Sequence, residues 1–167
     1  MTTVIFSHGQ ESGPWGTKIR AMAAKVKALG FHADSIDYRG IADPGERVDK
    51  LIAECGAIAD RLILVGSSMG GHVATAAAQT VNAAGLFVLA PAYYIGGDEG
   101  LTPVPPDLPI CIVHGWRDNV VPVESSIRFA SQCNATLHLV DGDHRLTANL
   151  DAINDYLEQF IRSISEQ

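Results

Sequence analysis

The stretch from Leu62 to Gly71 constrains the fold more than any other part of the chain. Four apolar residues, Leu62 to Val65, lead into the pattern G-x-S-x-G at residues 66–70, and a run of small residues follows. This order predicts a buried strand, a sharp turn with Ser68 at its apex, and the start of a helix. Glycine is expected at 66 and 70 because a side chain at either would collide with the opposite limb of the turn. The pattern alone is also compatible with a purely structural turn.

Short apolar runs alternate with helical segments along the rest of the chain. Strands are expected near residues 4–6, 33–36, 62–65, 86–89, 110–113 and 136–140, and helices near 19–29, 44–55, 69–80, 122–129 and 150–161. Continuous apolar strands separated by helices predict a parallel sheet covered on both faces. We therefore expect one α/β domain over residues 1–167, three-layered and doubly wound, with about six mostly parallel strands. The Pro- and Gly-rich stretch from Pro91 to Pro109 is expected to be a connection without helical period.

Composition excludes several classes of function. The net charge is −7 and no basic run occurs, which argues against nucleic acid or an anionic membrane as a partner. The cysteines, Cys55, Cys111 and Cys133, lack C-x-x-C spacing, so neither a disulfide framework nor a zinc site is indicated. A reducing compartment, the cytoplasm, fits this usage. No signal peptide or transmembrane segment is expected.

Chemistry-bearing residues follow four of the expected strands. Ligands of an open parallel sheet bind at the carboxyl ends of its strands, which here lead into residues 8–13, the Ser68 turn, and the loops with Asp118 and His144. A serine hydroxyl is a poor nucleophile without a base. Imidazole, with an ordinary pKa of about 6.5, suits that role for His144. Asp118 is placed to orient the imidazole and to stabilise its charged form.

The chain resembles a small α/β-hydrolase over nearly its whole length. The matching segments are the elbow Gly66–Gly70, the acid loop from His114 to Pro122 and the base loop from Gly142 to His144. The His8-Gly9 turn is similar to the oxyanion loop of that family. Two departures are expected: the first two antiparallel strands of the family are missing, and residues 91–109 are too short for a helical lid. A missing lid argues against long-chain lipid substrates.

The resemblance implies a catalytic triad of Ser68, Asp118 and His144 and an oxyanion hole formed by the backbone N–H groups of Gln10 and Met69. The implied enzyme is a serine hydrolase that cleaves small or exposed carboxylic esters or thioesters through an acyl-enzyme, with no cofactor and no metal. Amide cleavage and acyl transfer stay open at this point. The alternative is a non-catalytic binding or interaction module on the same fold. The sequence gives no indication of the oligomeric state.

Each triad residue also has a structural interpretation. Asp118 could cap the helix that follows Pro122. Asp141 and Asp143, in the turn before His144, are rivals for the role of the acid, although aspartate is common in turns for backbone reasons. His144 could be a solvated turn residue. Glu11, beside the expected oxyanion hole, should point to solvent because an inward carboxylate would repel the developing oxyanion.

Five aromatic or imidazole side chains at the active edge are candidates for a substrate pocket, although packing over the end of the sheet is an equal alternative for the four aromatic ones. They are His8, Trp15, Tyr93, Tyr94 and Trp116. For His8 and His114, structural hydrogen bonding is the favoured interpretation. The stretch from Gly9 to Lys18 lacks the spacing of a phosphate-binding loop, so no nucleotide site is expected.

Overall fold

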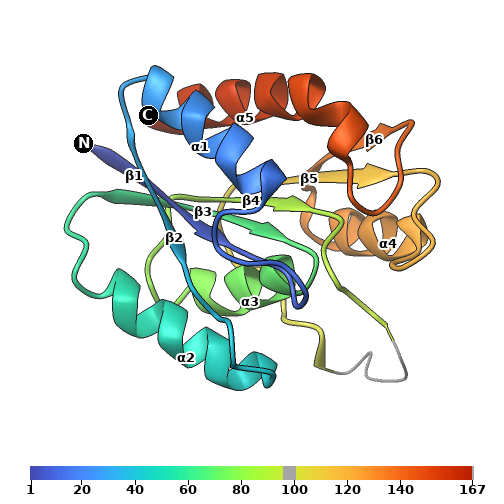
Figure 1. The fold of residues 1–167 in the computed structure, drawn as a ribbon, viewed down its shortest axis with the longest axis horizontal. Coiled ribbons are helices and arrows are strands. Elements are labelled where there is room, and N and C mark those ends of the chain that lie inside the picture. The colour runs from blue at the N-terminus through green and yellow to red at the C-terminus, as the bar shows by residue number, and fades with distance from the viewer. Residues whose placement is uncertain (96–100, 167) are drawn as a thin grey trace.

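The computed structural model describes residues 1–95 and 101–166, and a six-stranded parallel sheet forms its centre (Figure 1). The strands lie in the order β2-β1-β3-β4-β5-β6, and every neighbouring pair is parallel. This arrangement confirms the predicted doubly wound α/β fold. The strands are β1 (Thr2–Ser7), β2 (His32–Ile36), β3 (Arg61–Ser67), β4 (Gly85–Leu89), β5 (Ile110–Gly115) and β6 (Thr136–Val140).

Helices cover both faces of the sheet. In Figure 1, α1 and α5 lie above it, and α2, α3 and α4 lie below it. The helices are α1 (Thr17–Ala28), α2 (Pro44–Cys55), α3 (Met69–Ala78), α4 (Val123–Cys133) and α5 (Leu150–Ser165), with a short 3₁₀ turn, η2 (Thr147–Asn149), before α5. Helix α4 continues four residues beyond the predicted end at Phe129, and Asn134, in the left-handed conformation with φ 54°, terminates it.

The start of α2 follows directly from its sequence. The Asp43 side chain accepts a hydrogen bond from the backbone N–H of Glu46 at 2.9 Å, and Pro44 occupies the first helical position. Proline suits that position because its missing N–H would have no partner there. Strand β2 reads poorly as a strand because it lies at the edge of the sheet, where His32 and Asp34 are not fully buried.

Alternate strand residues feed two separate cores. Leu62 and Leu64 pack with α2, α3 and α4, whereas Ile63 and Val65 pack with α1 and α5. This alternation reflects the period of two in a strand, whose successive side chains point to opposite faces. Because both faces are covered, the β3 strand is apolar without interruption, as its sequence indicates.

The carboxyl ends of the strands lie along one edge of the sheet. Ser7 of β1 is in register with Gly66 of β3, and Ser67 of β3 is in register with Leu89 of β4. The loops after β1, β3, β5 and β6 therefore leave the sheet at the same edge. Within the connection expected from Pro91 to Pro109, residues 96–100 lie outside the described part of the chain.

The two-core arrangement predicts unequal costs for removing apolar side chains. Leu157 of α5 is fully buried, so we expect Leu157→Ala to reduce the free energy of unfolding by about 2 to 5 kcal/mol. Ile127 of α4 is 39% exposed, and Ile127→Ala should cost less than about 1 kcal/mol. Urea unfolding of both variants measures the difference. Equal losses would contradict the packing of α5 against the sheet.

Candidate active site

The turn between β3 and α3 holds Ser68 in a conformation that L-residues rarely adopt, with φ 54° and ψ −117°. A Cβ on Gly66 would overlap the carbonyl oxygen of Gly70, which agrees with the expected collision across the turn. Gly70 has a different reason for being glycine: a Cβ there would overlap the carbonyl oxygen of Ser7, at the end of β1. The two limbs of the elbow are therefore in close contact with each other, and the elbow also packs against the end of β1.

Three side chains from distant parts of the sequence meet above the sheet edge. His144 Nε2 lies 3.0 Å from Ser68 Oγ, and His144 Nδ1 lies 2.8 Å from Asp118 Oδ2. The carboxylate can only accept, so Nδ1 carries a hydrogen and Nε2 of the neutral ring is free to accept the serine proton. This is the hydrogen-bonding order that a serine nucleophile, its base and an orienting acid require.

The Asp118 side chain is fully buried, and each of its oxygens has partners. Oδ1 accepts the backbone N–H groups of Val120 and Val121, both at 2.8 Å, so the carboxylate closes its own turn and does not cap α4. Oδ2 lies within hydrogen-bonding distance of both His144 and His114, the latter at 3.1 Å. The His114 Nε2 also lies 2.9 Å from the Val121 carbonyl oxygen, so this nitrogen is the donor. Burial lowers the pKa of His114, which agrees with a neutral ring.

The two rival carboxylates have other partners. Asp141 is 88% exposed and accepts from Arg117 Nε at 2.8 Å. Asp143 Oδ1 accepts the backbone N–H groups of Arg145 and Leu146. Asp141 thus pairs with the acid loop and Asp143 closes the turn after itself. Among the described residues, only Asp118 has a carboxylate within hydrogen-bonding distance of the His144 ring.

The acid and base loops are joined through their backbones. The Arg117 N–H donates to the Gly142 carbonyl at 3.0 Å, and the Trp116 N–H donates to the Val140 carbonyl at 2.9 Å. A Cβ on Gly115 would overlap the Gly142 carbonyl oxygen. This close approach requires glycine at the end of β5, and it fixes the loop of Asp118 against the loop of His144.

The two segments that carry the expected oxyanion donors both adjoin Ser68. Met69 is the first residue of α3, so its N–H has no acceptor within the helix. On the other side, a Cβ on Gly9 would lie 3.7 Å from the Ser68 Cβ, which brings the Gly9-Gln10 turn against the nucleophile. His8 anchors that turn: its Nε2 accepts the Tyr38 N–H at 2.8 Å and its Nδ1 donates to the Gly9 carbonyl at 2.7 Å.

A cavity of about 650 Å³ opens at Ser68 and His144. Its wall includes Gln10, Glu11, Lys18, Val120, Arg145 and Thr147. None of the five predicted pocket residues is on this wall. His8 and Tyr93 are fully buried, so the prediction that they contact substrate is wrong: His8 bonds to backbone, and Tyr93 stacks on Phe129 with 4.0 Å between ring centroids. Trp15 and Trp116 are exposed, and Tyr94 packs against the Arg128 guanidinium.

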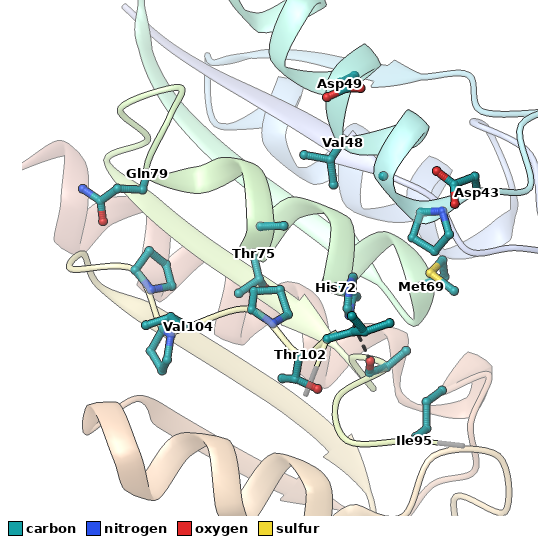
Figure 2. A pocket seen from close by; sticks show the side chains of 18 residues that line it. Asp43, Val48, Asp49, Met69, His72, Thr75, Gln79, Ile95, Thr102 and Val104 are labelled. Carbon is teal, nitrogen blue, oxygen red and sulfur yellow. Dashed lines mark hydrogen bonds between the residues drawn. The ribbon is translucent and has the colours of Figure 1, made fainter. Parts of the chain in front are cut away.

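A second cavity, of about 900 Å³, lies between α2, α3 and residues 92–95 and 101–106 (Figure 2). Met69 is on its wall, so this cavity begins one residue beyond the nucleophile. His72 also lines it, with Nδ1 3.3 Å from the Ala92 carbonyl oxygen, and burial lowers the pKa of this imidazole. Figure 2 shows Val48, Met69 and Val104 around the space, which is largely apolar.

Lys18 is a site residue that the sequence analysis did not identify. It occupies the second position of α1 and lines the Ser68 cavity, where it is half-buried. Burial lowers its pKa to about 8, against the opposing attraction of Asp118 and Asp143. A cation in the first turn opposes the helix dipole. That anomaly is the sequence signal that could have identified Lys18.

Within the described residues, no group of three or more histidine, cysteine, aspartate or glutamate side chains could hold a metal ion. None of the helices in the same part of the chain combines the length and the apolarity that a membrane span needs.

A family model described as an alpha/beta hydrolase domain matches residues 1–166. The chain belongs to the α/β-hydrolase family. No curated protein sequence matches it. The predicted resemblance is thereby confirmed, and family membership supports a hydrolytic activity in general terms.

Solved structures of other α/β-hydrolases are similar over most of the chain. A protein of this superfamily from Xanthomonas campestris pv. campestris has 29% sequence identity and a TM-score of 0.88, and the match covers 96% of this chain and 98% of that one. A serine hydrolase without a lid from Xanthomonas campestris has 23% identity and a TM-score of 0.82, with 97% and 81% covered. Est1E from Butyrivibrio proteoclasticus, with bound ferulic acid, has 16% identity and a TM-score of 0.84, with 100% and 90% covered.

The environment of Lys18 predicts a pH-dependent effect on stability. Because the folded state lowers this pKa to about 8, the unfolded chain binds more protons than the folded chain between about pH 8 and 10.5. Wild type should therefore gain stability relative to Lys18→Met as the pH rises through this window, and the variant should be at least as stable as wild type at pH 7. Urea unfolding of both proteins at pH 7 and pH 9.5 measures this. A variant that is less stable at pH 7, by an amount unchanged at pH 9.5, would contradict it.

Proposed function

We propose that this α/β-hydrolase is a serine hydrolase that cleaves carboxylic esters or thioesters through an acyl-enzyme. The observation that carries the proposal is the continuous hydrogen-bonded path from Ser68 Oγ through the His144 imidazole to the Asp118 carboxylate, with distances of 3.0 and 2.8 Å. The strained conformation of Ser68 supports it, because backbone strain of this kind is retained where the surrounding structure enforces it for function.

In the proposed reaction, Ser68 Oγ attacks the carbonyl carbon of the substrate while His144 Nε2 takes the hydroxyl proton. Asp118 holds the Nδ1–H and stabilises the imidazolium that forms. The N–H groups of Gln10 and Met69 donate to the oxyanion, and each such donor contributes roughly 3 kcal/mol to transition-state stabilisation. His144 then returns the proton to the leaving oxygen or sulfur, and water releases the acyl group by the same steps in reverse roles.

The surroundings of Ser68 support small or exposed acyl groups. The likeness to a serine hydrolase without a lid is consistent with an open site. A reducing compartment such as the cytoplasm is part of the same proposal, because the three cysteines are unpaired. Burial also raises the pKa of the Cys55 thiol to about 11 and that of the Cys111 thiol to about 12. Such thiols are poor nucleophiles, so Ser68 is the proposed nucleophile.

Removal of the nucleophile tests the proposal directly. We expect Ser68→Ala to lower kcat for 4-nitrophenyl acetate at least about 10³-fold, because among the described residues only the Ser68 hydroxyl is hydrogen-bonded to His144 Nε2. A fluorophosphonate probe should label wild type at Ser68 and leave the variant unlabelled. Unchanged turnover in the variant would refute the assignment. A wild-type protein that neither turns over the ester nor reacts with the probe would favour the non-catalytic module.

The identity of the acid is tested by two matched substitutions. Asp118→Asn should lower kcat about 10²- to 10⁴-fold, because an amide at Oδ2 cannot hold the required tautomer of His144. Asp143→Asn removes the same charge one residue from the base but keeps an oxygen for the turn N–H groups, so the loss should be less than about fivefold. Steady-state rates with 4-nitrophenyl acetate give the ranking. The reverse ranking would move the role of the acid to the turn.

A further inference from the structure

The cavity at Ser68 carries more positive than negative charge, although the chain as a whole has a net charge of −7. Lys18 and Arg145 are the cations on its wall. Glu11 is the acidic side chain among the described residues that line it, and it is exposed. Such a local excess of cations attracts anions into the cavity against the field of the rest of the molecule.

Lys18 differs from the other partly buried lysines of the described residues. Lys25 has a side chain 29% exposed and pairs with Glu158 at 2.6 Å, and Lys50, 35% exposed, donates to the Asp37 carbonyl at 2.5 Å. Among the described residues, Lys18 Nζ has neither an ion pair nor a hydrogen bond of this kind. A partly desolvated cation without a partner costs free energy of folding. An anion that enters the cavity would supply the missing partner.

Lys18 lines the same cavity as the base His144. The side chains with which it interacts electrostatically are Asp118, Asp143 and Arg145, which all belong to the acid and base loops. In the proposed reaction, the leaving oxygen must approach His144 Nε2 to receive its proton. A leaving group that reaches the base therefore enters the cavity that Lys18 and Arg145 also line. The apolar cavity beyond Met69 has neither of these cations on its wall.

We propose that Lys18 binds a carboxylate on the leaving group of the substrate, so that the preferred substrates are esters of hydroxy acids. This inference rests on the proposed serine hydrolase function and specifies its substrate class. Hydrolysis then consumes one water and yields a carboxylic acid and a hydroxy acid, whose carboxylate keeps its contact with Lys18 until release. Arg145 is exposed at the rim of the same wall and attracts the anion without enclosing it.

Matched substrates with and without the charge test this proposal. The first pair is 4-acetoxybenzoate and its neutral isostere 4-acetoxybenzamide, and the second is the 3-substituted pair. The acetyl group is constant, so the ratio of kcat/KM within a pair reports the recognition of the carboxylate. We expect wild type at pH 7 to prefer the carboxylate about tenfold or more in at least one pair. A hydrogen bond to a charged group supplies an effect of this size.

The variant Lys18→Met should bring this ratio close to one, through a higher KM for the carboxylate. Arg20→Met is the matched control, because it removes one positive charge from the same helix at an exposed position off the cavity wall. Its activity and its ratio should equal those of wild type. The ratio for wild type should also decline as the pH rises through about 8, where the free enzyme loses the Lys18 charge. The ratio for Lys18→Met should show no such decline.

Several results would overturn the inference. They are a wild-type ratio near one in both pairs, an equal fall of the ratio in Arg20→Met, or an unchanged ratio in Lys18→Met. A preference for the acyl-side anion in 4-nitrophenyl adipate over neutral 4-nitrophenyl hexanoate, with none in the acetoxy pairs, would also overturn it. Failure of the underlying function looks different: the neutral acetoxybenzamide would then be hydrolysed equally by wild type and Ser68→Ala, or by neither.

Discussion

The close approach of Gly66 to Gly70 is the constraint on which the rest of the site depends. With no side chain at Gly66, β3 can turn into α3 within a few residues and lift Ser68 above the sheet, and with none at Gly70 the turn can pack against the end of β1. The turn is also fixed by backbone bonds on both sides, since the Ser68 N–H donates to the Leu89 carbonyl and the Ala92 N–H donates to the Ser68 carbonyl. The strain at Ser68 is thus carried by β4 and its following loop as well as by the turn itself.

Much of the fold could be predicted because the sequence shows both the short apolar runs of buried strands and the apolar spacing of helices. The apolar run of β3 is explained by burial on both faces of the sheet, and Asp43 before Pro44 is explained as a helix cap. The structure contains the buried strand and the cap. The convergence of Ser68, Asp118 and His144 on one edge follows from the rule that parallel strands end together. Their distances do not follow from it, because the base loop after β6 must reach across β5 and β4 to meet Ser68.

The pocket predictions for His8 and Tyr93 are wrong because of the direction in which each side chain points. Position beside a strand end was known for His8 and Tyr93, but the direction of each side chain depends on partners far away in sequence. His8 turns inward because the segment after β2 supplies the Tyr38 N–H, and Tyr93 turns inward toward Thr75, whose hydroxyl lies 2.6 Å away. Lys18, in contrast, is a site residue that the sequence did not reveal. It lies near the base loop in the fold although the two segments are more than a hundred residues apart in the sequence.

The backbone bonds between the acid and base loops have a consequence for how this site can diversify. The contacts of Gly115 and Arg117 with Gly142 use main-chain atoms, and the exposed ion pair of Arg117 with Asp141 across the same junction adds little to them. Chain length and glycine content at this junction are therefore restricted, whereas the identities of its exterior side chains are not. Substitutions on the outer surface of this junction can therefore change its chemistry and leave the hydrogen bond between Asp118 and His144 in place.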